Sequence, residues 1–334
     1  MTSRKINWGI ISTANIGVNK VIPAMQKCAN LQIMGLASRD GESAKEVASK
    51  LDIPKSYDSY EAILDDPDID AIYNPLPNHL HFHWTKKAIE KGKHVLCEKP
   101  MTLNSEEINE LISLRNKHMV KVGEAFMVRT HPQWIEALKL IKKGELGKTL
   151  TIQSFFSYYK TDRNNIRNIP EYGGGAIWDI GCYPVHLSRY LFMEEPRRVL
   201  SLIDRDPELK IDRLATVVMD FDSGQSTFTV STQRVPHQRT TIFGDKNKLE
   251  VIIPFNAPND RESTISLDDG DLFMRNKKTI SFKACDQYTL QGEKFSEAIL
   301  KNSEVPVPLE DSLKNTITIE AIFKSEETGT WVHL

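Results

Sequence analysis

Short apolar runs alternate with longer amphipathic stretches along the first 125 residues of the chain. The apolar runs are bounded by Gly, Pro, Asn or Asp, as buried strands are, and lie at residues 6–11, 31–37, 69–74, 94–97 and 120–122. The stretches between them are typical of helices and lie at 18–28, 42–51, 57–65, 82–91 and 105–118. Strands that alternate with helices are typical of a parallel sheet covered on both faces. We therefore predict a doubly wound α/β domain over residues 1–125.

The pattern changes after residue 125. A helix is expected at 133–143, and a β-branched and aromatic strand at 149–158 is followed by no crossover helix. Further strands with turn signals between them are expected at 198–203, 213–222, 226–233, 239–244, 248–253, 263–267 and 279–283. Two helices, at 288–302 and 309–325, close the chain. We predict a second domain, residues 126–334, of the α+β class, with one large, mostly antiparallel open sheet and helices on one face.

Composition and charge exclude several classes of protein. The chain has 334 residues, of which 40% are hydrophobic and 26% charged, with a formal net charge of -2. This is typical of a soluble globular protein, and the lack of a basic run argues against nucleic acid or a membrane surface as partner. Four scattered cysteines and no apolar run long enough to cross a bilayer favour a cytoplasmic protein without disulfides or a metal site.

A charged pair ends the strand at 94–97. Glu98 and Lys99 follow it directly, and Pro100 prevents the strand from continuing. In open α/β sheets, ligands bind at the carboxyl ends of the strands, so Lys99 is a candidate for chemistry. The alternative interpretation is a surface ion pair, and these residues alone do not decide between the two.

The loop after the first strand has the layout of a dinucleotide site. It reads Ser12-Thr13-Ala14-Asn15-Ile16-Gly17, with Ser12 and Ala14 where the first two glycines of the usual motif would stand. The second strand ends in Ser38 and Arg39, and a hydroxyl with a guanidinium suits a 2′-phosphate. We therefore expect NADP rather than NAD, with NAD still possible. The alternative is an ordinary turn followed by a solvated Arg39, and Asp40 is expected to cap the next helix in either case.

The loop after the third apolar run contains two prolines and leads into a histidine-rich helix start. Asn78 is expected near a cofactor amide, because its side chain both donates and accepts hydrogen bonds. His81 and His83 would allow a metal, but no carboxylate or cysteine completes such a site, so we favour histidines that face solvent or the protein interior.

Gly173, Gly174 and Gly175 lead into a helix expected to continue to Phe192. Asp179, Tyr183 and His186 have the spacing of one helical face, and Pro184 should fall in the first turn or kink the helix. One interpretation is that Asp179 caps the helix and the other two residues pack. The other is an acid–base site, in which a nearby Lys99 ammonium would favour a Tyr183 phenolate and Asp179 would hold that ammonium.

These stretches together resemble the Gfo/Idh/MocA oxidoreductases. The resemblance rests on Ser12 to Gly17, on Gly92 to Pro100 and on Gly173 to His186, and Glu124 to Met127 and Gly144 to Gly147 also look like family signatures. It covers residues 5–195 well and the remainder in layout. Within the family, the chain is most similar to the branch of dihydrodiol dehydrogenases and NADP-dependent D-xylose dehydrogenases.

The resemblance implies a set of site residues. Lys99 and Tyr183 would be catalytic with Asp179 as their support, a cis peptide bond would precede Pro100, and His186 would contact a substrate hydroxyl or act as an alternative base. The expected cofactor contacts are Ser12, Thr13, Ala14, Asn15, Ile16, Ser38, Arg39, Pro75, Leu76, Asn78, His81, Glu98 and Lys99. Arg163 and Phe126 complete the expected substrate contacts, although Arg163 and Arg167 also fit solvated loop positions.

The sequence thus predicts an NADP-dependent oxidoreductase that acts on a hydroxyl or carbonyl carbon of a sugar, polyol or related cyclic alcohol. Lys99 and Tyr183 are expected in one pocket. Two alternatives remain, a cofactor-binding sugar sensor without turnover and a nicotinamide-assisted glycosidase. We also expect a homodimer or homotetramer that forms through the open face of the second sheet.

Overall fold

The computed structural model describes residues 4–334, which form two compact units. The first unit comprises the chain up to Thr130 together with Asp286–Leu313, and the second comprises His131–Cys285 and Lys314–Leu334. The sequence analysis placed the boundary at residue 125 and assigned all later residues to the second domain. The contacts instead group Asp286–Leu313 with the first unit.

The first unit contains a parallel sheet of six strands in the order β3-β2-β1-β4-β5-β6. This confirms the predicted doubly wound sheet. The strands are β1 (Ile6–Ile11), β2 (Leu31–Ala37), β3 (Lys55–Tyr57), β4 (Ala71–Asn74), β5 (His94–Cys97) and β6 (Val122–Glu124). The helices are η1 (Gly17–Val21), α1 (Ile22–Met25), α2 (Gly41–Lys50), α3 (Tyr60–Asp65), α4 (Asn78–Glu90), α5 (Ser105–His118), η2 (Met127–Thr130) and α8 (Gln287–Leu300).

Both faces of this sheet are buried. Successive residues of β4, Ile72 and Tyr73, belong to two different apolar clusters, and so do Val95 and Leu96 of β5. A strand buried on both faces reads as a continuous apolar run, which is why the sequence located β1, β2, β4 and β5 closely. The three-residue strand β3 was not expected, because Tyr57 reads equally well as the start of the helix that in fact begins at Tyr60.

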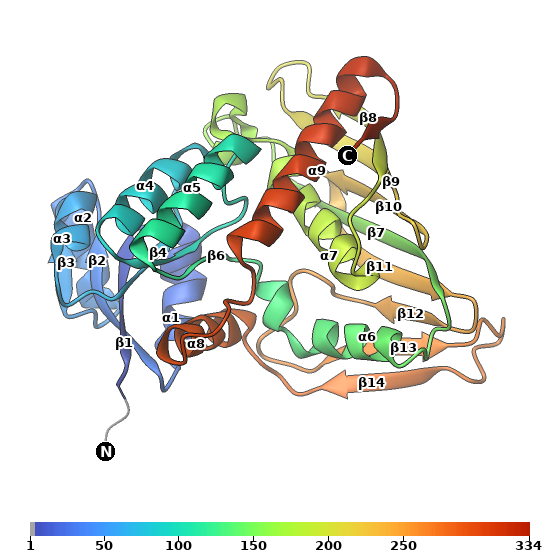
Figure 1. The fold of residues 1–334 in the computed structure, drawn as a ribbon, viewed down its shortest axis with the longest axis horizontal. Helices are drawn as coiled ribbons and strands as arrows, with labels where there is room; N and C mark the ends of the chain where they lie inside the picture. Colours follow the sequence, from blue (N-terminus) through green and yellow to red (C-terminus); the bar gives the residue numbers. More distant parts are fainter. Residues whose placement is uncertain (1–3) are drawn as a thin grey trace. The chain divides into compact units, whose positions relative to one another are not determined.

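Helix α8 packs on the first sheet although it lies more than 150 residues beyond β6 in sequence. The ring of its Phe295 lies 5.5 Å from the Trp8 ring, and the Trp8 indole N–H donates to Ser296 Oγ at 3.0 Å. Figure 1 shows α8 beside α1 and β1. This packing explains why the segment belongs to the first unit.

The second unit contains a sheet of nine strands in the order β14-β13-β12-β11-β7-β10-β9-β8-β15, in which only β7 and β10 pair in parallel among the described strands. The large, mostly antiparallel sheet is therefore confirmed. The strands are β7 (Thr149–Tyr159), β8 (Arg198–Arg205), β9 (Asp212–Asp220), β10 (Gln225–Ser231), β11 (Gln233–Gly244), β12 (Lys248–Val251), β13 (Ser263–Asp268), β14 (Lys278–Phe282) and β15 (Val332–His333).

Helices lie along one face of this second sheet. The helices of this unit are α6 (Pro132–Lys142), η3 (Ile166–Asn168), η4 (Pro170–Tyr172), η5 (Ile177–Gly181) and α7 (Cys182–Phe192), and the chain re-enters the unit within α9 (Leu309–Thr328). Of these, α6, η5 and α7 contact the strands. Figure 1 shows α6 and α7 over the strands. Ile152, Ser154 and Phe156 of β7 are buried, whereas Gln153 and Phe155 between them are exposed, as expected for a sheet with one open face.

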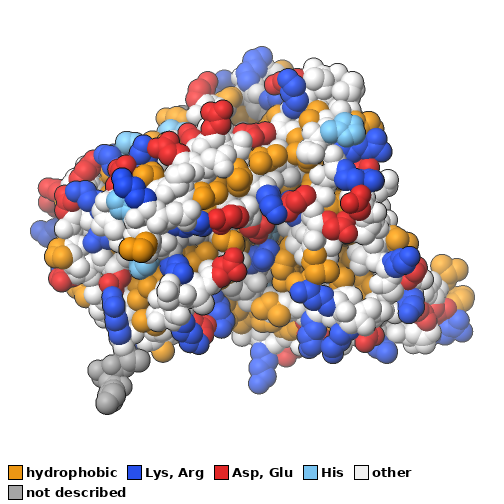
Figure 2. Space-filling model, viewed as in Figure 1, with side chains coloured by type: hydrophobic (Ala, Val, Ile, Leu, Met, Phe, Trp, Pro, Cys, Tyr) orange, Lys and Arg blue, Asp and Glu red, His pale blue; other side chains and the backbone are white. Residues whose placement is uncertain are grey.

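Between residues 4 and 334, no helix has both the length and the hydropathy needed to cross a bilayer. Acidic and basic side chains are intermixed over the face drawn in Figure 2. This distribution agrees with the near-zero net charge of the sequence.

Candidate active site

The carboxyl edge of the first sheet gathers most of the sequence-predicted cofactor residues. Ser12 follows β1, Ser38 follows β2, Pro75 follows β4 and Glu98 follows β5. Because these strands are parallel neighbours, the four positions lie along the same edge. The structure therefore brings together residues that are up to 86 positions apart in the sequence.

The loop after β1 contains a hydrogen bond between a serine hydroxyl and the backbone two residues later. Ser12 has a φ of 117°, a conformation that residues other than glycine rarely adopt, and its Oγ accepts a hydrogen bond from the Ala14 N–H at 2.9 Å. The position of the missing first glycine thus keeps a glycine-like backbone. The loss of that glycine from the motif does not prevent the turn.

Arg39 is anchored by a residue that the sequence analysis missed. Tyr60 is 5% exposed, and its hydroxyl lies within hydrogen-bonding reach of both Arg39 and Ser12. Burial raises the pKa of Tyr60, while the Arg39 charge and these two contacts oppose the rise. The exposed Arg39 guanidinium and the hydroxyls of Ser12 and Ser38 make a donor set that suits a phosphate group. A tyrosine at the start of a helix is typical of a residue that packs in the core, so the sequence did not indicate that Tyr60 belongs to the site.

The ring of His81 lies between two backbone carbonyl groups and, when neutral, donates a hydrogen bond to one of them. Its side chain is 1% exposed, Nε2 lies 2.6 Å from the Leu76 carbonyl oxygen, and Nδ1 lies 2.7 Å from the Pro100 carbonyl oxygen. Burial lowers the pKa of His81 to about 4. Its ring nitrogens face backbone groups of the protein itself, so the structure favours a supporting role over the expected contact with a cofactor.

Lys99 lies half-buried at the carboxyl end of β5, and the Lys99–Pro100 peptide bond is cis, as the family resemblance implied. Glu98 is held by the Tyr73 hydroxyl, which donates to its Oε1 at 2.6 Å. The Met101 N–H donates to Glu124 Oε1 at 2.7 Å. The Glu98 N–H donates to the carbonyl oxygen of buried Asn74 at 3.0 Å, so the backbone on both sides of Lys99 is held by buried partners.

The second unit carries a cluster around Asp179. Its carboxylate is 8% exposed and accepts from the Tyr158 hydroxyl at 2.5 Å and from Arg167 Nε at 3.0 Å. Burial and then the Asp179 charge raise the pKa of Tyr158, and the Asp179 charge raises the pKa of Arg167. Tyr158 was not foreseen, because it lies in an alternating strand, and Arg167 was considered mainly as a solvated loop residue. The partners found for Asp179 within this unit are thus a tyrosine and an arginine.

Tyr183 and His186 are both buried and lie in α7, directly after the π-turn that bears Asp179. The Tyr183 ring packs near Phe156 and Phe255, at centroid distances of 6.2 and 5.6 Å, and its hydroxyl group interacts electrostatically with Arg167. His186 is 1% exposed. Pro184 lies in the first turn of α7, one of the two positions expected for it, and the π-turn η5 directly precedes α7.

Asp212 of β9 holds the start of the helical segment that bears these residues. It is 2% exposed, and its Oδ2 accepts from the Ile177 N–H at 2.6 Å. Gly175 has a φ of +112°, and a Cβ there would lie 1.9 Å from Asp212 Oδ1. At Gly174, a Cβ would lie 2.7 Å from the carbonyl oxygens of Arg167 and Ile169. The last two glycines therefore allow the close approach that sets this turn.

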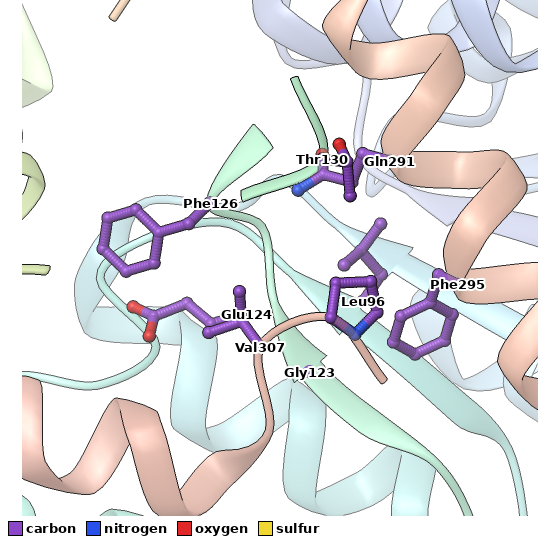
Figure 3. Close-up of a pocket in the computed structure, with 9 residues that line it drawn as sticks. Leu96, Gly123, Glu124, Phe126, Thr130, Gln291, Phe295 and Val307 are labelled. Carbon is purple, nitrogen blue, oxygen red and sulfur yellow. The ribbon is translucent and has the colours of Figure 1, made fainter. Parts of the chain in front are cut away.

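Two predicted substrate residues have other surroundings. Arg163 forms an exposed ion pair with Glu208. Phe126 is 1% exposed and lines a small cavity of the first unit together with Glu124, Leu96 and Phe295. Figure 3 shows the Glu124 carboxylate and the Phe126 ring on the same side, away from Leu96 and Phe295. No group of His, Cys, Asp and Glu side chains suited to a metal ion occurs in the described part of the chain.

The buried carboxyl of Asp212 gives a testable dependence of stability on pH. Burial raises the pKa of Asp212 to about 7, compared with about 3.9 in an unfolded chain. Because the folded state then binds this proton more tightly, its contribution to the free energy of unfolding is full below about pH 4 and is lost as the pH rises to about 7. The change Asp212→Asn keeps an acceptor oxygen and removes the charge. Between pH 4 and 7, the free energy of unfolding measured in urea should therefore fall by up to about 4 kcal/mol less for the variant than for the wild type.

Asp220, on the same strand, provides the matched control. Its carboxylate is 6% exposed, and the bond from Arg198 lowers its pKa. Its contribution to stability is therefore present at neutral pH and is lost as the pH falls, so Asp220→Asn should destabilise the protein mainly at neutral pH. Equal pH profiles for the two variants would contradict the assignment of Asp212.

Comparisons with known proteins agree with this arrangement. Residues 6–126 match the model described as "Oxidoreductase family, NAD-binding Rossmann fold", and residues 134–250 match the "GFO/IDH/MocA C-terminal domain". The chain is 36% identical to D-xylose 1-dehydrogenase (NADP(+)) 2 of Haloferax volcanii, over 98% of this chain and 99% of that protein. It is 32% identical to trans-1,2-dihydrobenzene-1,2-diol dehydrogenase of Xenopus laevis, over 73% of this chain and 74% of that protein.

Among solved structures, aldose-aldose oxidoreductase from Caulobacter crescentus, complexed with glycerol, superposes with a TM-score of 0.90 at 26% identity. The match covers 99% of this chain and 100% of that one. The expected similarity to xylose and dihydrodiol dehydrogenases is thus confirmed. The two family models match a part of each unit, and the chain belongs to the Gfo/Idh/MocA family of oxidoreductases, with an NAD-binding Rossmann domain at its N-terminal end.

Proposed function

We propose that the protein is an NADP-dependent oxidoreductase of a sugar, a polyol or a related cyclic alcohol, in which Lys99 and Tyr183 transfer the proton. The observation that carries the proposal is Lys99, which lies half-buried at the carboxyl edge of the sheet that also presents the Ser12 loop and Arg39. The similarity to a D-xylose dehydrogenase and to an aldose-aldose oxidoreductase supports the substrate class.

The residues at this edge fit a dinucleotide. Small side chains and a glycine-like backbone at Ser12 leave room for a pyrophosphate, and Arg39 with Ser38 would hold a 2′-phosphate. When bound, the nicotinamide supplies the hydride acceptor or donor. The protein's own part is to hold the cofactor, to place the Lys99 ammonium near a reacting oxygen and to provide a phenol for its proton.

In the second unit, the Asp179 cluster would prepare Tyr183 for this role. Arg167 is held by Asp179 and interacts with the Tyr183 hydroxyl, and a neighbouring cation favours the phenolate over the phenol. The Asp179 carboxylate is in turn held by Tyr158. In this proposal, Arg167 of the second unit supplies part of the positive charge that favours the Tyr183 phenolate. From the sequence, this charge was expected from Lys99 alone.

The cofactor preference is tested by Arg39→Ala. We expect the dissociation constant of NADP to rise by about 10- to 100-fold, because a bidentate guanidinium–phosphate pair contributes about 1.5–3 kcal/mol. The dissociation constant of NAD should change by less than about 3-fold, since NAD has no 2′-phosphate. Fluorescence titration with both reduced cofactors measures this. Arg4→Ala removes an arginine paired with Asp70 outside the proposed site and serves as the control. Equal losses for NADP and NAD would exclude the proposed contact.

The substrate class is tested by a panel of aldoses, polyols and keto-sugars with each nicotinamide in both directions. Turnover with at least one of them is expected. Tight cofactor binding with no change in absorbance for any member would favour a sensor without turnover, and a cofactor that stays bound through purification would favour a glycosidase.

We also propose that two copies associate through the open face of the second sheet. The strand register places Leu202, Thr216, Thr229, Phe155 and Arg239 in one row across five strands. Leu202 is 76% exposed and Phe155 is 36% exposed. Two large exposed apolar side chains on an open sheet face favour association with a second copy, which light scattering of the purified protein tests.

A further inference from the structure

We propose that His81 and Glu124 are positioning residues for Lys99, and that both act on the single peptide group that joins Pro100 to Met101. This inference rests on the proposed role of Lys99. It assigns a purpose to two buried, titratable side chains that the proton-transfer scheme does not use.

The two side chains bind the opposite ends of one peptide group. The Pro100 carbonyl oxygen lies 2.7 Å from His81 Nδ1, and the Met101 N–H donates to Glu124 Oε1 at 2.7 Å. A peptide group is planar, so a partner at its carbonyl and another at its N–H together fix the rotation of the plane. Pro100 has a fixed φ, and Lys99 is the next residue before it. The direction of the Lys99 backbone is therefore set one residue away by these two contacts.

The contacts also join the ends of three neighbouring strands. His81 is in the first turn of α4, and its Nε2 lies 2.6 Å from the carbonyl oxygen of Leu76, in the loop after β4. Glu124 is the last residue of β6, and the peptide group itself follows β5. A neutral imidazole carries one N–H, and with that hydrogen on Nδ1 His81 donates to the Pro100 carbonyl oxygen. His81 then attaches the loop that carries Lys99 to the start of α4, and Glu124 attaches it to the end of β6, at the edge where a cofactor would bind.

Burial makes these contacts important. His81 is 1% exposed, Glu124 is 4% exposed, and Met101 is fully buried. A buried hydrogen bond is hard to replace, because water cannot reach the group that loses its partner. Packing alone does not require a carboxylate or an imidazole at these positions, since an aliphatic side chain fills space without the penalty of burying a polar group. The polar groups are therefore best explained by the peptide group that they hold.

The test uses His81→Leu, Glu124→Leu and the double variant, with the conservative change Glu124→Gln. We expect each leucine variant to lower kcat by about 100-fold, as a misplacement of about 1 Å does, while the dissociation constant of the cofactor changes by less than about 3-fold. Because both residues hold the same peptide group, the double variant should lose little more than the more affected single variant. Glu124→Gln keeps an acceptor oxygen and should recover most of the rate.

A matched control is His94→Leu. His94 is at the amino end of the same strand, and its Nδ1 accepts from the Lys121 N–H at 2.8 Å. It should lower stability as His81→Leu does and leave kcat within about 3-fold. Losses of kcat that multiply in the double variant, or an equal loss in the His94 control, would overturn the proposal.

A second measurement does not depend on turnover. Hydrogen exchange followed by mass spectrometry reports the protection of the Met101 amide in the peptide that contains it. Exchange at this amide should accelerate at least 10-fold in His81→Leu and in Glu124→Leu, and should stay unchanged in His94→Leu. Unchanged exchange would exclude the positioning role. If exchange accelerates but Lys99 proves dispensable for turnover, the proposed function fails while the two contacts stand.

Discussion

Replacing Lys99 with methionine is expected to lower kcat by about 10²- to 10⁴-fold, the range that a positioned proton-transfer group contributes. Methionine keeps an unbranched apolar stem and removes the ammonium. Since β5 is held by backbone pairing with β4 and β6, the fold and the cofactor site should persist. Initial rates at the absorbance of the reduced nicotinamide measure kcat, and fluorescence titration should give a dissociation constant for NADP within a few-fold of the wild type.

Lys93 provides a matched control for this experiment. It precedes the same strand, is 7% exposed, and donates to the carbonyl oxygens of Asp66 and Ile69 at 2.7 and 2.8 Å. Lys93→Met removes an ammonium that holds two carbonyl groups, so it should lower the free energy of unfolding and leave kcat within about 3-fold. Turnover of the Lys99 variant within a few-fold of the wild type, with cofactor bound, would refute the proposed role of Lys99.

The sequence predicted the first sheet well because its strands are buried on both faces. Such strands stand out as apolar runs, and residues that follow them, such as Ser12, Ser38 and Glu98, are placed at one edge by the parallel topology alone. The capping of α2 by Asp40 was also predictable, since the cap depends on residues within one turn. Local signals thus located both the edge and the residues at it.

The partners of these residues were not predictable in the same way. Tyr60 holds Arg39 and Ser12, Tyr158 holds Asp179, and Glu124 holds Met101, and each pair is separated by at least 21 positions in the sequence. The sequence pattern around a buried tyrosine or carboxylate does not indicate which distant residue that side chain will contact. For the same reason, the packing of α8 on β1 could not be read from the chain, because an amphipathic helix shows which face is apolar but not which sheet it covers.

The triple glycine shows how a local pattern and a distant residue combine. The sequence marked Gly173 to Gly175 as unusual and could not say why three were needed. For Gly175 the answer lies in Asp212, which is 37 residues beyond it and whose carboxylate occupies the space where a side chain at Gly175 would project. Because Asp212 binds the Ile177 N–H, this approach fixes the first turn of the segment that bears Asp179.

Gly175→Ala should therefore be among the most destabilising single substitutions in the second unit. The new Cβ would lie 1.9 Å from Asp212 Oδ1, and the φ of +112° is one that alanine rarely adopts. Either Asp212 moves and leaves the Ile177 N–H without its partner, or the turn shifts together with Asp179. We expect a loss of about 3 kcal/mol or more in the free energy of unfolding, from backbone strain of about 1–3 kcal/mol and a lost buried hydrogen bond of about 1–3 kcal/mol. Urea unfolding measures this loss.

Gly144→Ala separates the two contributions. Gly144 has a φ of +72°, and nothing lies within 4 Å of the position that its Cβ would occupy, so this change should cost only the backbone strain of about 1 kcal/mol. In an Asp212→Ala background the colliding carboxylate is gone, and adding Gly175→Ala should then cost only the backbone strain of about 1–3 kcal/mol at its φ of +112°. If Gly175→Ala costs as little as Gly144→Ala in the wild-type background, the close approach of Gly175 to Asp212 does not determine the turn. In that case the glycine is required only for its backbone conformation, and the position of Asp179 must depend on other contacts of η5.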